Sequence, residues 1–339
     1  MKYTVSILIV VALFTSCRST LVTINSFNQE DDFKNDYDRE LLKGNVQTYA
    51  IYNNVTTQNG NTDQKQLNVE FNDKGFITRF ESYNEDGSLN IRIENIYTND
   101  TILTETRRYL KNNQHVTIEY TTDTIKNDNK IIGWIKKQYS VMNNGYNTEQ
   151  IEILDENHDL SKSIMIQQGD TLHTTLHSMQ YDENNRLIKS ISTQVGGYKD
   201  GYSTTISYKY DKNGNVTEVI CTPETRFSRV VYQYNKKNRM KLMTTYSIKP
   251  SYYMGAIIDN PSIPQEHIIT ETYFDSFLNP KKVITYTNDK LFVKAQKTKY
   301  KYDKTGNWVR QKVYEKNKDD KRWNYIYQLT REISYFNQD

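Results

Sequence analysis

The chain has 339 residues, of which 36% are hydrophobic and 12% aromatic, with a formal net charge of +3 and a mean hydropathy of −0.82. This charge is too balanced for a typical nucleic-acid-binding protein, and a content of only 13 glycines argues against a disordered chain. A compact globule of this length is usually more apolar, so the 28 tyrosines favour a sheet with one hydrated face, where a ring is buried and its hydroxyl stays hydrated.

Residues 1–17 have the pattern of a lipoprotein signal peptide. Lys2 gives a positive start, residues 5–14 form a mostly apolar core too short to span a bilayer, and two small residues precede Cys17. We therefore predict that Cys17 becomes the lipid-modified N-terminus, with the membrane as a partner. The expected location is the cell envelope, at the outer membrane of a Gram-negative bacterium. The alternative is an ordinary cleaved signal peptide with an incidental cysteine.

Residues 18–44 are polar and charged with little periodicity, and we expect them to form a tether between the lipid and the folded domain. Cys221 is the only other cysteine, so a lipidated Cys17 would leave no disulfide framework. Because Cys221 lies in a strand-like run, an inert buried thiol is expected there.

From residue 45 to residue 339 the sequence predicts a single all-β domain. Turn signals recur about every dozen residues, and the runs between them are rich in β-branched and aromatic residues. An outer-membrane barrel is not expected, because charges fall on both faces of some runs. Arg107 and Arg108, for example, point to opposite sides of one predicted strand.

A seven-residue pattern of strand, tight turn and strand recurs along this domain. Its first column is Tyr or Phe, its second is Asp or Asn, its fifth is Gly or Asn, and its seventh is apolar. The fifth column indicates a residue with positive φ, which Gly and Asn tolerate. Copies begin at Phe71, Tyr83, Tyr181, Tyr210, Tyr234 and Tyr302. The predicted turn residues of the late copies are Asp182, Asn185, Asp211, Gly214, Asn235, Asn238, Asp303 and Gly306.

At these residues the chain resembles the YD repeat of Rhs-type bacterial surface proteins. The resemblance implies one elongated antiparallel sheet of hairpins, with a curved or solenoid-like form left open. It does not imply toxin delivery, because no Asp-Pro-x-Gly segment of the kind that ends a toxin shell is present. A seventh candidate copy, residues 274–280, places Leu278 at the glycine column, so a different turn type is expected there.

The spacing between the copies at Tyr234 and Phe274 is longer than between the other late copies. The excess falls in residues 249–264, where three prolines oppose strand pairing and several side chains are apolar. We predict a ligand surface that uses Tyr252 and Tyr253. The alternative is a plug that covers a sheet face or an open edge.

Catalytic and metal-binding patterns are weak. His173 and His177 have the spacing of a helical metal pair, but the segment predicts a strand, where four residues span roughly 13 Å. The acidic cluster at residues 155–159 lacks a regular calcium-ligand spacing, which favours a solvated turn. We therefore predict no catalytic residue, no metal and no cofactor.

Three functional classes remain open. The first is a non-catalytic binding or scaffold module of the cell envelope, with a glycan, peptide or protein ligand and no nucleic acid. The second is a purely structural or immunity-type lipoprotein. The third is a glycan-active enzyme, which would need two acidic residues facing each other across a groove. The sequence favours them in that order.

Overall fold

The computed structural model describes residues 42–336, except for 58–59, 111–114, 128–129, 143–144, 198–199, 223–228, 249–251, 254–255, 258–265 and 287–290. The regular elements of this part are all strands, as the sequence predicts. They are β1 (Val46–Thr57), β2 (Gly60–Phe71), β3 (Ile77–Tyr83), β4 (Leu89–Thr98), β5 (Ile102–Leu110), β6 (His115–Asn127), β7 (Lys130–Met142), β8 (Asn147–Asp155), β9 (Leu160–Gln167), β10 (Asp170–Tyr181), β11 (Leu187–Val195), β12 (Ser203–Tyr210), β13 (Val216–Thr222), β14 (Arg229–Tyr234), β15 (Met240–Ile248), β16 (Tyr252–Tyr253), β17 (Ala256–Ile257), β18 (Glu266–Phe274), β19 (Pro280–Tyr286), β20 (Phe292–Tyr302), β21 (Trp308–Asn317) and β22 (Asn324–Tyr335).

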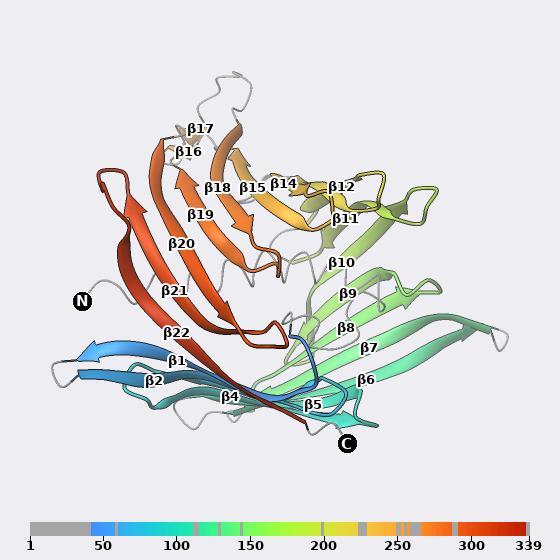
Figure 1. The fold of residues 1–339 in the computed structure, drawn as a ribbon. Helices are drawn as coiled ribbons and strands as arrows, with labels where there is room; N and C mark the ends of the chain where they lie inside the picture. The colour runs from blue at the N-terminus through green and yellow to red at the C-terminus, as the bar shows by residue number, and fades with distance from the viewer. Residues whose placement is uncertain are drawn as a thin grey trace.

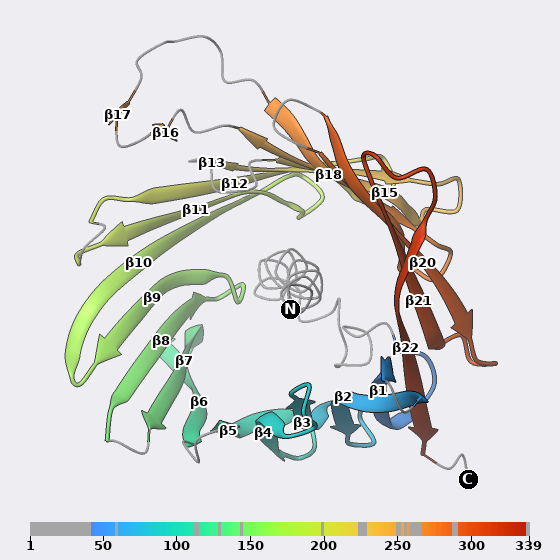
Figure 2. The same cartoon turned by 90° about the vertical axis from the view of Figure 1, so that its left-hand side faces the viewer.

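Twenty of these strands form one closed antiparallel barrel (Figures 1 and 2). Each barrel strand pairs with the next one along the chain, and β22 pairs with β1 from Val46↔Tyr335 to Asn53↔Leu329. The short strands β16 and β17 pair only with each other, outside the barrel sheet. The expectation of an elongated or solenoid-like sheet is therefore wrong, because the sheet closes on itself. The sequence prediction that the barrel wall does not contact lipid stays a prediction.

A bulge at the first column of each repeat explains why the sheet curves. The register shifts between Gln180 and Tyr181, between Lys209 and Tyr210, and at the equivalent step of the other copies that begin at Phe71, Tyr83, Tyr234, Phe274 and Tyr302. A bulge bends its strand and increases the local twist. Repeated bulges of this kind introduce the curvature that a closed sheet requires.

The two faces of the wall differ in burial. Directly opposed residues such as Tyr49 and Val69, or Trp134 and Leu154, lie on a "buried face" that contains most of the barrel's buried side chains. Residues at alternate positions form a "charged face", where Glu81 opposes Arg92 and Lys209 opposes Glu218. Side chains converge on the concave wall of a barrel, so we assign the buried face to the interior and the charged face to the exterior.

A small apolar cluster lies where the first and last strands of the barrel meet. Leu42, Val46, Tyr49, Val69 and Phe71 are its buried members, and Ile333 and Tyr335 of β22 pack against it. Residue 42 was expected to lie in the polar tether, yet its side chain is only 7% exposed. The last residues before β1 therefore pack with the barrel.

Candidate functional site

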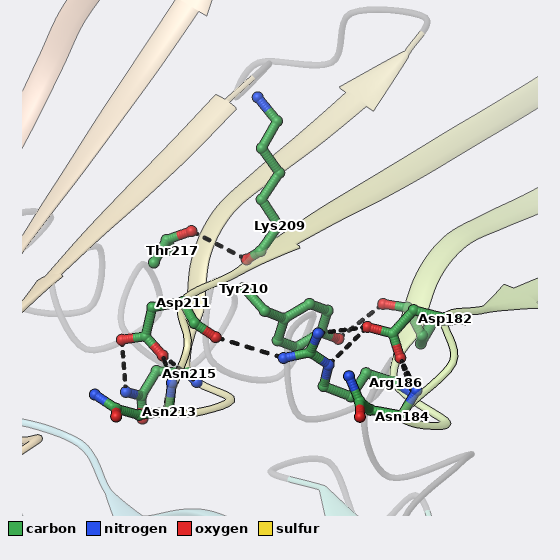
Figure 3. Close-up of polar contacts among 10 residues, drawn as sticks. Asp182, Asn184, Arg186, Lys209, Tyr210, Asp211, Asn213, Asn215 and Thr217 are labelled. Atoms are coloured by element: carbon green, nitrogen blue, oxygen red, sulfur yellow. Dashed lines mark hydrogen bonds and ion pairs between the residues drawn. The ribbon is translucent and has the colours of Figure 1, made fainter.

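The repeated hairpin turns share one hydrogen-bond pattern. In the turn after β12, Asp211 Oδ1 accepts hydrogen bonds from the N–H groups of Asn213 (2.8 Å) and Asn215 (3.0 Å), as Figure 3 shows. The N–H of Gly214 donates to the Asp211 carbonyl, and the N–H of Asp211 donates to the Asn215 carbonyl. The same side-chain bonds form at Asp182, Asn235 and Asp303. The second column thus caps the turn.

The fifth column of each turn has a positive φ. Its members include Gly214 (84°), Gly306 (89°), Asn185 (58°) and Asn238 (61°). Leu278 takes the same conformation at 65°, and Asp275 caps its turn with the same two bonds. The expectation of a different turn type at residues 274–280 is therefore wrong.

A further copy of the turn, not predicted from the sequence, lies in the acidic cluster at residues 155–159. Asp155 Oδ1 accepts hydrogen bonds from the N–H groups of Asn157 and Asp159, and His158 has a φ of 64°. The His158 ring stacks on Trp134 with a centroid distance of 3.5 Å. Two departures conceal the pattern in the sequence, Leu154 at the aromatic first column and His158 at the glycine column.

These turns lie side by side at one end of the barrel, because they follow alternate strands of an up-and-down sheet. We call the turns at residues 155–159, 182–186, 211–215, 235–239, 275–279 and 303–307 the "turn rim". Side chains join neighbouring turns of the rim. Arg186 donates to the Asp211 carbonyl (3.4 Å), Asn215 to Asn238 Oδ1 (2.5 Å), and Arg239 to the Ser276 carbonyl (3.0 Å). Figure 3 shows the first of these links.

The first-column tyrosines connect each repeat to the one before it. Tyr210 donates its hydroxyl to the Leu187 carbonyl (2.7 Å), and Tyr234 donates to the Val216 carbonyl (2.8 Å). Each acceptor is the apolar seventh column of the preceding copy. These hydroxyls were expected to stay hydrated, but they satisfy backbone carbonyls instead. Burial raises the pKa of Tyr234 to about 12.

At the last turn of the rim, Asn307 joins the segment before β1 to strand β22, and we call this set of contacts the "lock". Asn307 is 2% exposed; its Oδ1 accepts from the Lys43 N–H (2.8 Å), and its Nδ2 donates to the Lys43 carbonyl (2.7 Å) and the Tyr335 hydroxyl (2.9 Å). The Tyr335 hydroxyl in turn donates to Asp303 Oδ2 (2.6 Å). Burial raises the pKa of Asp303, but hydrogen bonds from Tyr335 and Thr305 outweigh this effect and hold the pKa below its usual value.

The buried face carries a polar row across β7 to β11. His177 lies between the hydroxyls of Ser163 (3.2 Å from Nε2) and Ser192 (3.0 Å from Nδ1), and burial lowers the pKa of its imidazole. On the next strands Glu152 opposes Ser163 and Lys136. Burial also raises the pKa of Glu152, although Gln150 donates a hydrogen bond to it. Both imidazole nitrogens contact hydroxyls and neither contacts a carboxylate, so this row does not form a Ser–His–acid triad.

The remaining predicted residues are placed as follows. His173 and His177 lie on one strand, β10, and no group of three potential metal ligands occurs within the described ranges. Cys221 is half-buried on β13, opposite Ile206. Tyr252 and Tyr253 form β16, and their role in ligand binding stays a prediction. Cys17 and most of the predicted tether lie outside the described residues.

On the charged face, the two buried carboxylates Glu81 and Glu218 are each surrounded by cations. Glu81 is 6% exposed and pairs with Arg79 (2.8 Å) and Arg92 (2.9 Å). Burial raises the pKa of Glu81, but hydrogen bonds from Tyr83 and the two arginines outweigh it, so the pKa lies below its usual value. Glu218 has the same arrangement with Lys209 and Arg229. No helix in the described part of the chain is long and apolar enough to cross a membrane.

No family model matches this chain. No curated protein matches it either. Among solved structures, a porin-like protein from Bacteroides uniformis is 8% identical, with 90% of this chain and 100% of that chain covered and a TM-score of 0.31. A porin-like protein from Bacteroides vulgatus is 15% identical, with 86% and 100% covered and a TM-score of 0.24. The TcdB2-TccC3-Cdc42 structure is 9% identical, with 87% of this chain and 24% of that chain covered and a TM-score of 0.21.

These similarities are too distant to support any statement about activity or location. The assignment to YD-repeat, Rhs-like proteins is wrong, because the strands close into a 20-stranded barrel instead of one elongated sheet. The Tyr-Asp turn motif describes local hairpin geometry and does not identify a family.

Proposed function

We propose that this protein is a non-catalytic binding or scaffold module of the cell envelope, whose barrel stands in water and is held at the membrane by lipid on Cys17. The proposal of an envelope location rests on the signal-peptide pattern of residues 1–17. The barrel and the turn rim supply a rigid frame. The polar row around His177, on the buried face, offers hydroxyl contacts and no activated nucleophile. This favours binding over catalysis.

One observation carries the proposal that the wall faces water. Lys297 is the central residue of β20 and is exposed on the charged face, with Lys299 and Lys301 following at alternate positions. The outer wall of a membrane barrel is an apolar band about 25 Å tall, and an Arg or Lys at its midplane costs roughly 2–4 kcal/mol. Arg79 and Arg92 lie on the same outer face of β3 and β4. A wall with several such residues is poorly suited to lipid contact.

Fractionation of the full-length wild-type protein and the Cys17→Ala variant tests whether lipid on Cys17, and not the barrel wall, holds the protein at the membrane. The wild type should sediment with membranes until detergent is added, and Cys17→Ala should be recovered in the soluble fraction without detergent. Resistance of the soluble variant to trypsin would show that its barrel is folded. If Cys17→Ala stays with the membrane after an alkaline carbonate wash, the wall itself contacts lipid and the proposal fails.

A further inference from the structure

Three neighbouring strands carry a concentration of positive charge on the outer face. We call this set the "basic stripe". It consists of Lys282 on β19, Lys297, Lys299 and Lys301 on β20, and Arg310, Lys312 and Lys316 on β21. The stripe holds more positive charge than the net +3 of the whole chain. The rest of the protein is therefore net negative, and the stripe is a local excess of positive charge on the wall.

Within the stripe, like charges face each other in register. Lys282 is directly opposite Lys297, Lys299 is opposite Lys312, and Lys301 is opposite Arg310. Like charges at directly opposed positions destabilise a sheet. Their repetition across three strands breaks a local rule of sheet design, and such violations are expected at functional sites.

The stripe lacks the neutralising partners found elsewhere on the charged face. Glu81 and Glu218 each pair with two cations, but none of the stripe residues forms a salt bridge with a described residue. On the adjoining strand β18, Glu271 accepts hydrogen bonds from Tyr286 (2.7 Å) and Tyr273 (3.4 Å) instead of pairing with a lysine. The positive charges of the stripe therefore remain available to an external anion.

We propose that the basic stripe binds a linear acidic polysaccharide that lies along the strands. This inference rests on the proposed function, because it assumes that the outer wall is in water. Alternate lysines on β20 are roughly 6.7 Å apart, and neighbouring strands are about 4.8 Å apart, so the cations form a regular array. A linear chain with one carboxylate or sulfate on each sugar or each second sugar can contact several of them at once.

Other occupants fit the stripe less well. A protein partner would need an apolar core in the interface, and between the charges the stripe offers few apolar side chains, of which Ala295 is itself buried. Single-stranded nucleic acid binds through free aromatic faces. Here the Lys299 ammonium lies over the Tyr314 ring (5.4 Å) and the Lys282 ammonium over the Tyr273 ring (5.5 Å). A membrane surface would favour apolar side chains that insert among the lipids.

The test compares two full-length triple variants, both made on the Cys17→Ala background. The stripe variant is Lys297→Gln, Lys299→Gln and Lys301→Gln. The matched control is Lys137→Gln, Lys162→Gln and Lys189→Gln, which removes the same charge from the same face on β7, β9 and β11. Binding is measured to polygalacturonate and heparin, with neutral dextran, phosphatidylglycerol-containing vesicles and oligo(dT) as further probes.

We expect the parent protein to bind both acidic polysaccharides, with affinity falling roughly a hundredfold between about 50 and about 200 mM salt if five cations are engaged. The stripe variant should lose at least about tenfold in affinity and show a shallower salt dependence, whereas the control should change little. The stripe variant should also melt at an equal or higher temperature, because like-charge opposition is relieved.

Three outcomes would overturn the proposal: no binding of either polysaccharide, equal losses in the two variants, or tighter binding of vesicles or oligo(dT) than of polysaccharide. If the protein is soluble without detergent but binds no polysaccharide, the proposed role of the basic stripe is refuted and the proposed function is not. A protein that cannot be released from the membrane would refute the proposed function itself.

Discussion

The lock at Asn307 gives the most direct test of how the barrel is held closed. We consider Asn307→Ala, which removes the side chain and its hydrogen bonds to the Lys43 N–H, the Lys43 carbonyl and the Tyr335 hydroxyl. At about 1 kcal/mol for each bond, the variant should lose about 3 kcal/mol of unfolding free energy. For a domain of this size the melting temperature should fall by about 6 °C.

A second turn supplies the control. Asn215 occupies the same turn position as Asn307, and its Nδ2 donates to Asp211 Oδ2 (2.9 Å) and Asn238 Oδ1 (2.5 Å). The Asn238 side of this contact is exposed, so water can replace it. Asn215→Ala should therefore cost about 1 kcal/mol or less.

Urea denaturation followed by circular dichroism measures the free-energy loss, and limited trypsin digestion reports on the lock locally. Cleavage after Lys43 should accelerate in Asn307→Ala and not in Asn215→Ala. If the two variants lose equal stability and Lys43 is cleaved equally slowly in both, the side chain of Asn307 does not hold the barrel ends together and the reasoning is wrong.

Two further predictions concern the same turn. Gly306→Val should lower the melting temperature far more than Lys304→Val, because Gly306 has a φ of 89°. An added Cβ would also lie 3.1 Å from Lys43 Nζ and 3.2 Å from Phe277 Cε1. Equal effects of the two substitutions in thermal melts would contradict this. The folded pKa of Asp303 lies below its reference value of 3.8, so ionised Asp303 stabilises the fold above that pH, and this contribution is lost as the pH falls through the folded pKa. The stability difference between wild type and Asp303→Asn, measured by urea titration, should therefore be largest near neutral pH and shrink in acid, and a difference independent of pH would exclude this linkage.

Much of the local structure follows from the sequence. The strands and their order could be predicted because alternating runs and turn residues act over short distances. The capping role of Asp211 and the positive φ of Gly214 follow from the same rules. Leu278 and His158 were not predicted, because Gly and Asn are the residues expected at positive φ, yet Asp275 and Asp155 cap these two turns in the same way as the others.

Closure of the barrel could not be predicted in the same way. It depends on the sum of small bends along the whole sheet, and the pairing of β1 with β22 joins residues that are far apart in the chain. The bulges of the copies recognised in the sequence do have a signal, since each of these falls at the aromatic first column of its repeat. The basic stripe also had a signal in the alternation of Lys297, Lys299 and Lys301. That these lysines belong to a larger cluster depends on the strand register, which places Lys312 opposite Lys299 and Arg310 opposite Lys301.

The pairing of β1 with β22 has a consequence for biosynthesis. Strand β1 is among the first parts of the domain to leave the ribosome, and β22 is the last strand to follow. Until then the growing sheet has two open edges with unpaired backbone groups, which are templates for association with other chains. Since each strand pairs with the next, most of the sheet can form by local hairpins, but the final pairing must bridge a long sequence separation. A chain that lost β22 would keep both edges open, so premature termination should produce aggregation instead of a smaller barrel.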